Sequence, residues 1–208
     1  MTACNSKRID ESASLKQNKT DTIIKHDTIY LNTANDTSWQ EGFGLTHDPD
    51  KDSIWHKPVS YYLNDTKLSP LAFEFYYGYF RPSDNGATDE LFKYVATSND
   101  KLRPFYRWCL YKTIQISDGA LWGHVGEPAK QYAEKFPLEF FEYIDSDTSG
   151  AKYNEWTRAI YLTEIEESDD KKFKSIKVLR AANMRNNCKS CNVKTIKRID
   201  KFIADCYE

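Results

Sequence analysis

Residues 69–80 read SPLAFEFYYGYF, and this stretch indicates a helical fold. Ser69 is a good residue to precede a helix, and Pro70 suits the first helical position because its missing N–H would have no partner there. The ten residues that follow carry a single charge, on Glu74. A helix that is apolar on every side belongs in a protein interior. The stretch therefore predicts a helix that is buried nearly all round.

The same arrangement occurs twice more along the chain. Arg103-Pro104 precedes FYRWCLYKTI, and Phe136-Pro137 precedes LEFFEYI. The three prolines, the first being Pro70, are 34 and 33 residues apart. Stacked helical hairpins repeat at intervals of this size. The prediction is an all-α, mainly helical domain, which is either an irregular bundle or a degenerate array of helical hairpins.

Helical periodicity continues to the C-terminus. Apolar residues spaced by three and four positions predict helices over residues 151–167, 170–186 and 192–206. In the last of these, one stripe is formed by Ile196, Ile199, Ile203 and Cys206. These stripes indicate a core, and Trp108 and Trp156 lie in segments of the same kind.

The N-terminal part differs in composition from the rest. Residues 5–21, NSKRIDESASLKQNKTD, contain few apolar residues and no aromatic one, which is typical of a flexible, extended tether. The later segment 21–31 could add one short strand or pack along the domain. We therefore expect a tether over residues 1–37 and a helical domain over residues 38–208. Within the domain, residues 39–58 are expected to form a loop, because glycines and a proline punctuate them.

The composition excludes several protein classes. The chain has 14 Tyr, 11 Phe and five Trp residues, which argues against disorder beyond the N-terminus. No apolar run reaches the roughly 18 residues that a membrane span needs. The formal net charge of -2 provides no field that would attract nucleic acid. We therefore expect no nucleic-acid partner and no cofactor.

Thr2-Ala3-Cys4 resembles the last positions of a bacterial lipobox, in which an acylated cysteine follows small residues. The polar stretch that follows fits this resemblance. It implies that Cys4 is the lipid attachment point and that the lipid is the only contact with a membrane. The domain would then face the periplasm or the outer surface of the cell envelope, which is an oxidising compartment.

The spacing of the other cysteines favours one local disulfide. A helix over residues 192–206 would hold Cys191 and Cys206 roughly 22 Å apart, whereas a disulfide needs Cα atoms within about 7 Å. Cys188 is equally remote from Cys206, so Cys188 and Cys191 are expected to pair with each other. Cys109 and Cys206 could form a second bridge or remain buried thiols. A zinc site is disfavoured because no second close Cys or His pair exists.

The search for catalytic and metal-binding motifs gives weak candidates. Asp118, His124 and Glu127 lie in a polar stretch where a glycine-rich turn could bring them together as a general acid–base set. The aspartates of HDPDKDS, residues 47–53, resemble a calcium loop, but Ser53 replaces the glycine that such a loop requires. We therefore expect no metal site and no catalytic residue.

Charge is separated along the chain. Residues 139–170 contain ten acidic and two basic residues, and residues 171–208 contain eleven basic and three acidic ones. These segments either neutralise each other or present a charged face to a partner. The candidate partner-binding residues are Glu164, Glu166, Glu167, Asp169, Asp170, Trp39, Trp55 and Trp122.

In its organisation, the chain resembles small envelope lipoproteins of Gram-negative bacteria, among which immunity proteins that neutralise antibacterial toxins recur. The resemblance implies a periplasm-facing lipoprotein that binds another protein, such as a secreted toxin. The lack of a catalytic signature predicts that the chain is not an enzyme. One alternative is a ligand-capture lipoprotein with an aromatic pocket. A hydrolase-like enzyme built on Asp118, His124 and Glu127 is a third reading.

Overall fold

The computed structural model describes residues 36–167 and 170–207, and residues 36–208 form one compact unit. The lipid attachment at Cys4 and the tether therefore lie outside the described residues. In chain order, the elements are η1 (Ser38–Gln40), β1 (Ser53–Ile54), β2 (Lys57–Pro58), α2 (Ser60–Leu63), α3 (Pro70–Tyr76), α4 (Gly86–Thr97), α5 (Arg103–Ile116), α6 (Leu121–Lys135), α7 (Pro137–Asp145), α8 (Ala151–Glu167), α9 (Asp170–Asn187) and α10 (Val193–Cys206). The prediction of a mainly helical fold is confirmed.

Three helices begin at the proline signals. α3 and α7 start at Pro70 and Pro137, and α5 starts one residue before Pro104. Ser69 has the extended backbone of a residue that precedes a helix, but its side chain makes no capping hydrogen bond. Its backbone N–H instead donates to the Tyr106 hydroxyl at 2.8 Å. The fixed backbone angle of proline, together with this tertiary contact, therefore sets the start of α3.

The C-terminal helices lie where the periodicity predicted them. α8, α9 and α10 match the expected ranges to within one residue at each end. On α10, Ile199, Phe202, Ile203 and Cys206 are buried. The Asn192 side chain caps this helix by accepting a hydrogen bond from the backbone N–H of Thr195 at 2.9 Å. A stripe on one side of the helix therefore enters the core, as expected for an amphipathic helix.

Two N-terminal expectations were incomplete. Residues 39–58, expected to be a loop, contain the short antiparallel hairpin β1–β2, in which Ile54 pairs with Lys57. α4 carries no proline signal and was not predicted, although the Asn85 side chain caps it by accepting from the backbone N–H groups of Ala87 and Thr88. Packing against α5 supports both α4 and the hairpin.

The expectation of a turn near His124 was wrong. The polar stretch continues as α6, which contains Gly123, Gly126 and even Pro128 within the helix. Val125, Gly126 and Ala129 are buried on its inner side. α6 makes its most extensive contacts with α8, so packing outweighs the low helix propensity of these residues.

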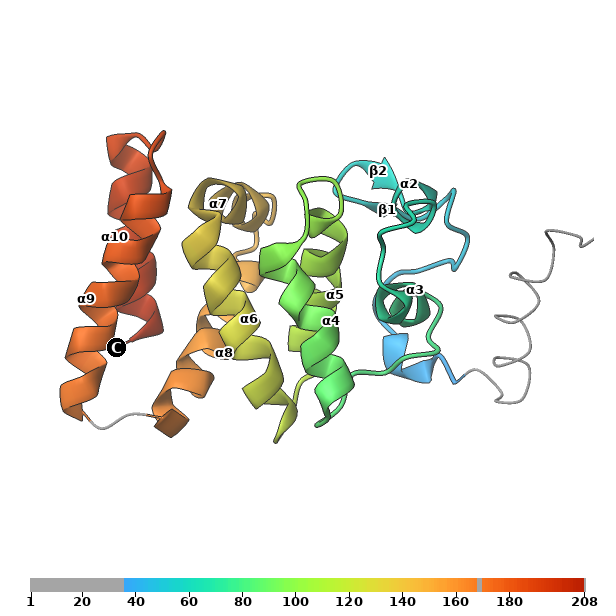
Figure 1. The fold of residues 1–208 in the computed structure, drawn as a ribbon, viewed down its shortest axis with the longest axis horizontal. Helices are drawn as coiled ribbons and strands as arrows, with labels where there is room; N and C mark the ends of the chain where they lie inside the picture. Colours follow the sequence, from blue (N-terminus) through green and yellow to red (C-terminus); the bar gives the residue numbers. More distant parts are fainter. Residues whose placement is uncertain (1–35, 168–169, 208) are drawn as a thin grey trace, which may run out of the picture. The chain divides into compact units, whose positions relative to one another are not determined.

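The helices of the described unit follow one another in a row of layers (Figure 1). α3 lies beside α4 and α5, the next layer contains α6 and α8, and α9 and α10 form the other end. The helices that begin at the prolines have seven, fourteen and nine residues, so the regular proline spacing does not mark equivalent repeats. The structure is thus a mainly helical domain in which the prolines mark no regular repeat.

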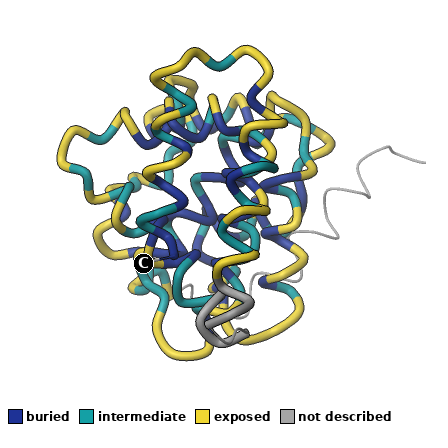
Figure 2. The backbone as a smooth tube through the Cα atoms, turned by 90° about the vertical axis from the view of Figure 1, so that its left-hand side faces the viewer, coloured by how far each residue is buried: buried dark blue, intermediate teal, exposed yellow. Residues whose placement is uncertain are grey.

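Aromatic side chains form much of the core. Phe140 lies between α6, α8 and α10, with ring centroids 5.5 Å from Trp156 and 4.8 Å from Phe202. Nearer the N-terminus, Phe75 packs against Trp108 at 5.5 Å. Viewed from the α9–α10 end, buried segments occupy the inside and exposed turns the outside (Figure 2). Within the described residues, no helix is both long and apolar enough to cross a membrane.

Candidate functional site

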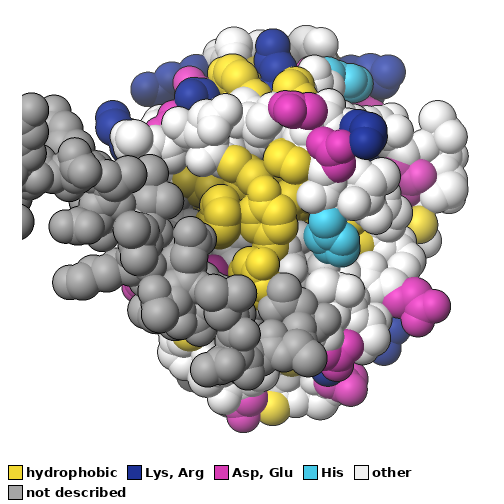
Figure 3. Space-filling model, turned by 90° about the vertical axis from the view of Figure 1, so that its right-hand side faces the viewer, with side chains coloured by type: hydrophobic (Ala, Val, Ile, Leu, Met, Phe, Trp, Pro, Cys, Tyr) yellow, Lys and Arg dark blue, Asp and Glu magenta, His cyan; other side chains and the backbone are white. Residues whose placement is uncertain are grey.

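Three aromatic residues at the end of α3 form a partly exposed surface. Phe73 is 39% exposed and Tyr79 is 38% exposed, while Tyr77 between them is half-buried. The ring centroids of Phe73 and Tyr77 are 4.8 Å apart, and those of Tyr77 and Tyr79 are 6.0 Å apart. We call these three residues the α3 aromatic surface. The end of the unit that carries α3 shows hydrophobic side chains gathered in a patch (Figure 3).

This surface corrects the expectation that residues 69–80 are buried nearly all round. α3 is at one end of the row, so the described helices that pack against it, α4 and α5, cover only one side (Figure 1). Ala72, Phe75 and Tyr76 point to that side and are buried. Phe73 lies outside that side and is exposed. An apolar pattern cannot distinguish an enclosed helix from one at the end of a row.

The turn after α3 brings Tyr79 back beside Tyr77. The backbone N–H of Tyr79 donates to the Glu74 carbonyl at 2.9 Å, and that of Gly78 donates to the Phe75 carbonyl at 3.3 Å. This is a Schellman ending, which needs a left-handed residue, and Gly78 has φ +80°. A Cβ at Gly78 would also lie 2.5 Å from a Thr37 side-chain carbon. Only glycine fits there, so the chain holds the surface in one conformation.

Trp39, an expected partner anchor, lies beneath this surface. Its indole N–H donates to the Gly78 carbonyl at 3.3 Å, and its ring packs against Phe75 at 5.2 Å. The neighbouring Gln40 is buried, and its amide donates to the Phe75 carbonyl at 2.6 Å. Trp39 thus fixes the base of the α3 aromatic surface and exposes only part of its ring.

The other expected anchors lie elsewhere. Trp55 is at the tip of the β1–β2 hairpin, over the guanidinium group of Arg107. Trp122 is on α6, where its ring centroid is 5.3 Å from the Arg158 guanidinium. No ring contact joins any two of Trp39, Trp55 and Trp122 in the part of the chain that the structure describes. The structure therefore does not bring the predicted tryptophans together.

The acidic candidates cannot be placed as a surface. Glu164, Glu166 and Glu167 belong to the last turns of α8, and Asp170 begins α9, whereas Asp169 is outside the described residues. Their side chains lie outside the described residues.

The basic C-terminal segment is partly neutralised within the fold. Arg198 on α10 donates to both carboxylate oxygens of Asp145 on α7, at 2.5 and 2.6 Å. Arg185 on α9 pairs with Asp200 on α10. Charge separation along the sequence therefore becomes, in part, pairing between neighbouring helices.

The expected acid–base set does not assemble. The His124 ring nitrogens contact two other carboxylates, Asp89 at Nδ1 (2.7 Å) and Asp84 at Nε2 (2.8 Å). Hydrogen bonds to Asp84 and Asp89 raise the pKa of His124, so the ring holds its proton more tightly. Glu127 instead pairs with Lys130 on its own helix, and Asp118 is exposed. His124 thus joins α6 to the start of α4 and leaves neither nitrogen for a substrate.

The calcium-like loop has a structural role in the fold. Asp52 is buried and accepts hydrogen bonds from the Thr46 N–H and hydroxyl, the His47 N–H and the Tyr76 hydroxyl, all between 2.6 and 3.1 Å. Burial alone would raise the pKa of Asp52, but the bonds from Tyr76 and Thr46 outweigh burial and lower it. Among the described residues, no group of His, Cys, Asp and Glu is arranged to hold a metal ion.

The cysteines behave as the spacing indicated. Cys188 and Cys191 form a disulfide in the turn between α9 and α10, with their Cα atoms 5.2 Å apart. Cys109 and Cys206 are buried thiols outside any disulfide. Burial raises the pKa of the Cys109 thiol well above its usual range.

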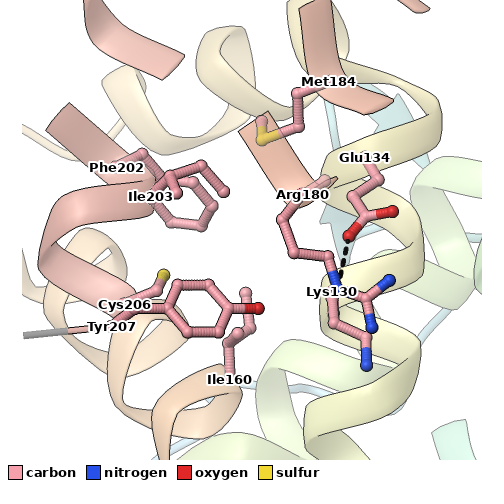
Figure 4. A pocket seen from close by; sticks show the side chains of 10 residues that line it. Lys130, Glu134, Ile160, Arg180, Met184, Phe202, Ile203, Cys206 and Tyr207 are labelled. Atoms are coloured by element: carbon pink, nitrogen blue, oxygen red, sulfur yellow. Dashed lines mark ion pairs between the residues drawn. The ribbon is translucent and has the colours of Figure 1, made fainter. Parts of the chain in front are cut away.

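A small cavity lies between α6, α8, α9 and α10 (Figure 4). Its walls are mainly apolar, and at one side Arg180 approaches Glu134 with a 3.2 Å ion pair. Burial raises the pKa of Glu134, and the Arg180 charge offsets part of that rise. The cavity offers a water-sized sphere only about 10 Å³. This is about the room that one water molecule needs and far below the roughly 300–1,000 Å³ of ligand pockets.

Comparison of the chain with protein-family models, curated proteins and solved structures finds no match. Function is therefore inferred from the side chains of this chain.

Proposed function

We propose that this chain works by binding another protein and that the α3 aromatic surface is the centre of the contact. The observation that supports this proposal is the mutual packing of Phe73, Tyr77 and Tyr79 on a helix end whose turn is fixed by Gly78. Aromatic residues dominate the binding energy of protein interfaces, because a rigid ring buries a large area at a small entropic cost. Contiguous exposed apolar patches typically mark interaction sites.

The more specific proposal is an immunity lipoprotein. Thr2-Ala3-Cys4 would provide a lipid anchor at Cys4, and the domain would face the periplasm or the outer surface. An inhibitor stationed there would meet an incoming antibacterial toxin before the toxin reaches its target. This proposal rests on the lipobox-like start and on the organisation of the chain.

A ligand-capture lipoprotein is the second candidate, and the cavity in Figure 4 is the observation in its favour. Its small volume makes protein binding the better-supported function.

The test uses the full chain and one matched control. Phe73→Ser and Tyr79→Ser remove rings from the α3 aromatic surface, whereas Leu138→Ser removes an apolar side chain that is 44% exposed on α7. A partner isolated from envelope or secreted fractions is measured against each variant. If Phe73 or Tyr79 is an anchor, its replacement by serine weakens binding by at least about tenfold, whereas Leu138→Ser leaves the affinity unchanged.

Equal affinity of all variants would rule out the α3 aromatic surface as the contact. The immunity proposal has its own test, in which cells that produce the chain are challenged with the partner. Loss of protection in both the Cys4→Ser and the Phe73→Ser variants would support the immunity proposal. Full protection by both variants would contradict it.

A further inference from the structure

Two arginines one turn apart on α5 differ in how their nitrogens are used. Arg103 engages all three nitrogens: Nε donates to Glu139 at 2.8 Å, Nη1 to the Ser98 carbonyl at 3.1 Å and Nη2 to Asp100 at 2.5 Å. Arg107 uses only Nη1, which donates to the Tyr132 hydroxyl at 2.7 Å and to Glu139 at 3.1 Å. The two arginines share one carboxylate, and only Arg103 has a hydrogen-bond partner for each of its three nitrogens.

The remaining edge of Arg107 is buried without a hydrogen-bond partner. Arg107 is fully buried, and its Nε and Nη2 atoms contact no acceptor among the described residues. Leaving a buried donor unsatisfied costs about 1–3 kcal/mol, and more for a charged group. Nε and Nη2 form the side-on edge of a guanidinium group, which presents two parallel N–H donors to the two oxygens of a carboxylate or phosphate. The structure thus keeps a costly anion-binding edge in its interior.

The guanidinium group of Arg107 lies among aromatic rings, with the Glu139 carboxylate at Nη1 and the Lys152 amine near the Tyr143 ring. The Arg107 guanidinium lies 4.0 Å from the Tyr143 ring centroid and 4.5 Å from that of Trp55. The Lys152 amine lies 4.4 Å from the centroid of the same Tyr143 ring. Burial lowers the pKa of Lys152, and the charge of Arg107 lowers it further against the opposing effect of Asp147. An anion would relieve the repulsion between these two cations, and flat rings would contact an apolar body.

Trp55 is the partly exposed ring that lies over the guanidinium group of Arg107. Of the side chains that contact the guanidinium, Tyr132 and Tyr143 are buried, while Trp55 and Glu139 reach the surface. Trp55 and His56 form the two-residue turn of the β1–β2 hairpin, with φ values of 49° and 63°. Such a turn favours Asn and Gly, and bulky residues in it carry strain of order 1–3 kcal/mol each. Relief of this strain would favour a turn in which Trp55 no longer lies over the guanidinium group.

We propose that the side-on edge of Arg107 binds a carboxylate carried on an apolar body, which enters when the Trp55 turn lifts. Lys152 adds positive charge beside the site, and Tyr143 forms its inner wall. This site lies on α5, α7 and the hairpin, and it is independent of the α3 aromatic surface. A negative result for the Arg107 site therefore does not affect the proposal of protein binding, and the reverse also holds.

The first experiment needs no substitution in the site. The full chain is titrated with benzoate, with neutral benzamide as the matched control and with inorganic phosphate as the competing anion. Arginine Nε–H resonances are followed by NMR, and heats by calorimetry. We expect benzoate to shift the Arg107 Nε–H signal downfield, while the Arg103 signal stays in place and benzamide shifts neither. Absence of benzoate binding in the millimolar range, binding that leaves the Arg107 signal unchanged, or tighter binding of phosphate would overturn the proposal.

Variants then test each part of the site. Arg107→Lys keeps the charge but removes the side-on edge, and it should weaken benzoate binding by about ten- to a hundredfold. Lys152→Gln should weaken binding by several-fold, and Lys93→Gln on the surface of α4 should not change it. Trp55→Ala should accelerate association, because the cover no longer has to open. If Arg107→Lys does not fold, the wild-type titration and the Trp55 and Lys152 variants still decide, and unchanged rates and affinities in both would refute the site.

Discussion

Replacement of Gly126 by alanine tests the closest helix contact in the fold. Gly126 is buried on α6, where the helix packs against α8. A Cβ at this position would overlap the Thr163 hydroxyl and lie 2.5 Å from the backbone carbonyl oxygen of Ala159. Gly123, one turn earlier on the same helix, is exposed, and a Cβ there meets nothing within 4 Å. The two glycines therefore form a matched pair that separates helix propensity from packing.

The magnitudes follow from these contacts. Alanine stabilises a helix interior over glycine by about 1 kcal/mol, which applies to Gly126 and is the upper limit for Gly123 in the first turn of α6. At Gly126, the added methyl also displaces the Thr163 hydroxyl, which donates to the Ala159 carbonyl at 3.2 Å. Loss of this hydrogen bond costs about 1 kcal/mol. Overpacking against the α8 backbone costs about 1–3 kcal/mol more. We expect Gly126→Ala to lose about 1–3 kcal/mol of unfolding free energy and Gly123→Ala to gain at most about 1 kcal/mol.

Urea unfolding followed by helical ellipticity measures both variants, and an unchanged dependence on urea shows that only stability has changed. The Thr163→Ala background provides a further check. It removes the side-chain overlap but leaves the Ala159 carbonyl in place, so Gly126→Ala should cost less there without becoming neutral. If Gly126→Ala is as stable as Gly123→Ala, α6 and α8 do not approach as closely as the structure describes.

Three other predictions concern buried or paired groups. Asp52→Asn should destabilise the fold by about 1.5–3 kcal/mol, because an amide cannot accept all the hydrogen bonds of the carboxylate, whereas Asp50→Asn on the surface should be neutral in the same unfolding assay. Because the folded pKa of His124 is raised, the unfolding free energy that His124 contributes should be fully present below its unfolded pKa of about 6.5 and should disappear as pH rises through the folded value. A pH series in which the His124→Gln variant loses the same unfolding free energy would contradict this. Iodoacetamide should label Cys109 and Cys206 only after unfolding, as mapped by mass spectrometry, and rapid labelling of the native protein would show that they are accessible.

The features that the sequence predicted correctly depend on interactions within a few residues. Pro70 and Pro137 start helices because the proline ring fixes a backbone angle, whatever the rest of the chain does. α10 follows from the spacing of its own apolar residues. The disulfide between Cys188 and Cys191 follows from their closeness in the chain. Each of these conclusions needs only local geometry.

The candidate sites depend on contacts between distant segments. His124 meets carboxylates 35 and 40 residues away, and nothing near it in the chain indicates them. Arg107 and Arg103 belong to the same helix, yet only packing against α7 and the hairpin leaves one of them with an unsatisfied edge. Phe73 is exposed because α3 ends a row of helices, although its own segment is apolar throughout. Periodicity shows which face of a helix is apolar, but the packing of other helices determines whether that face is covered.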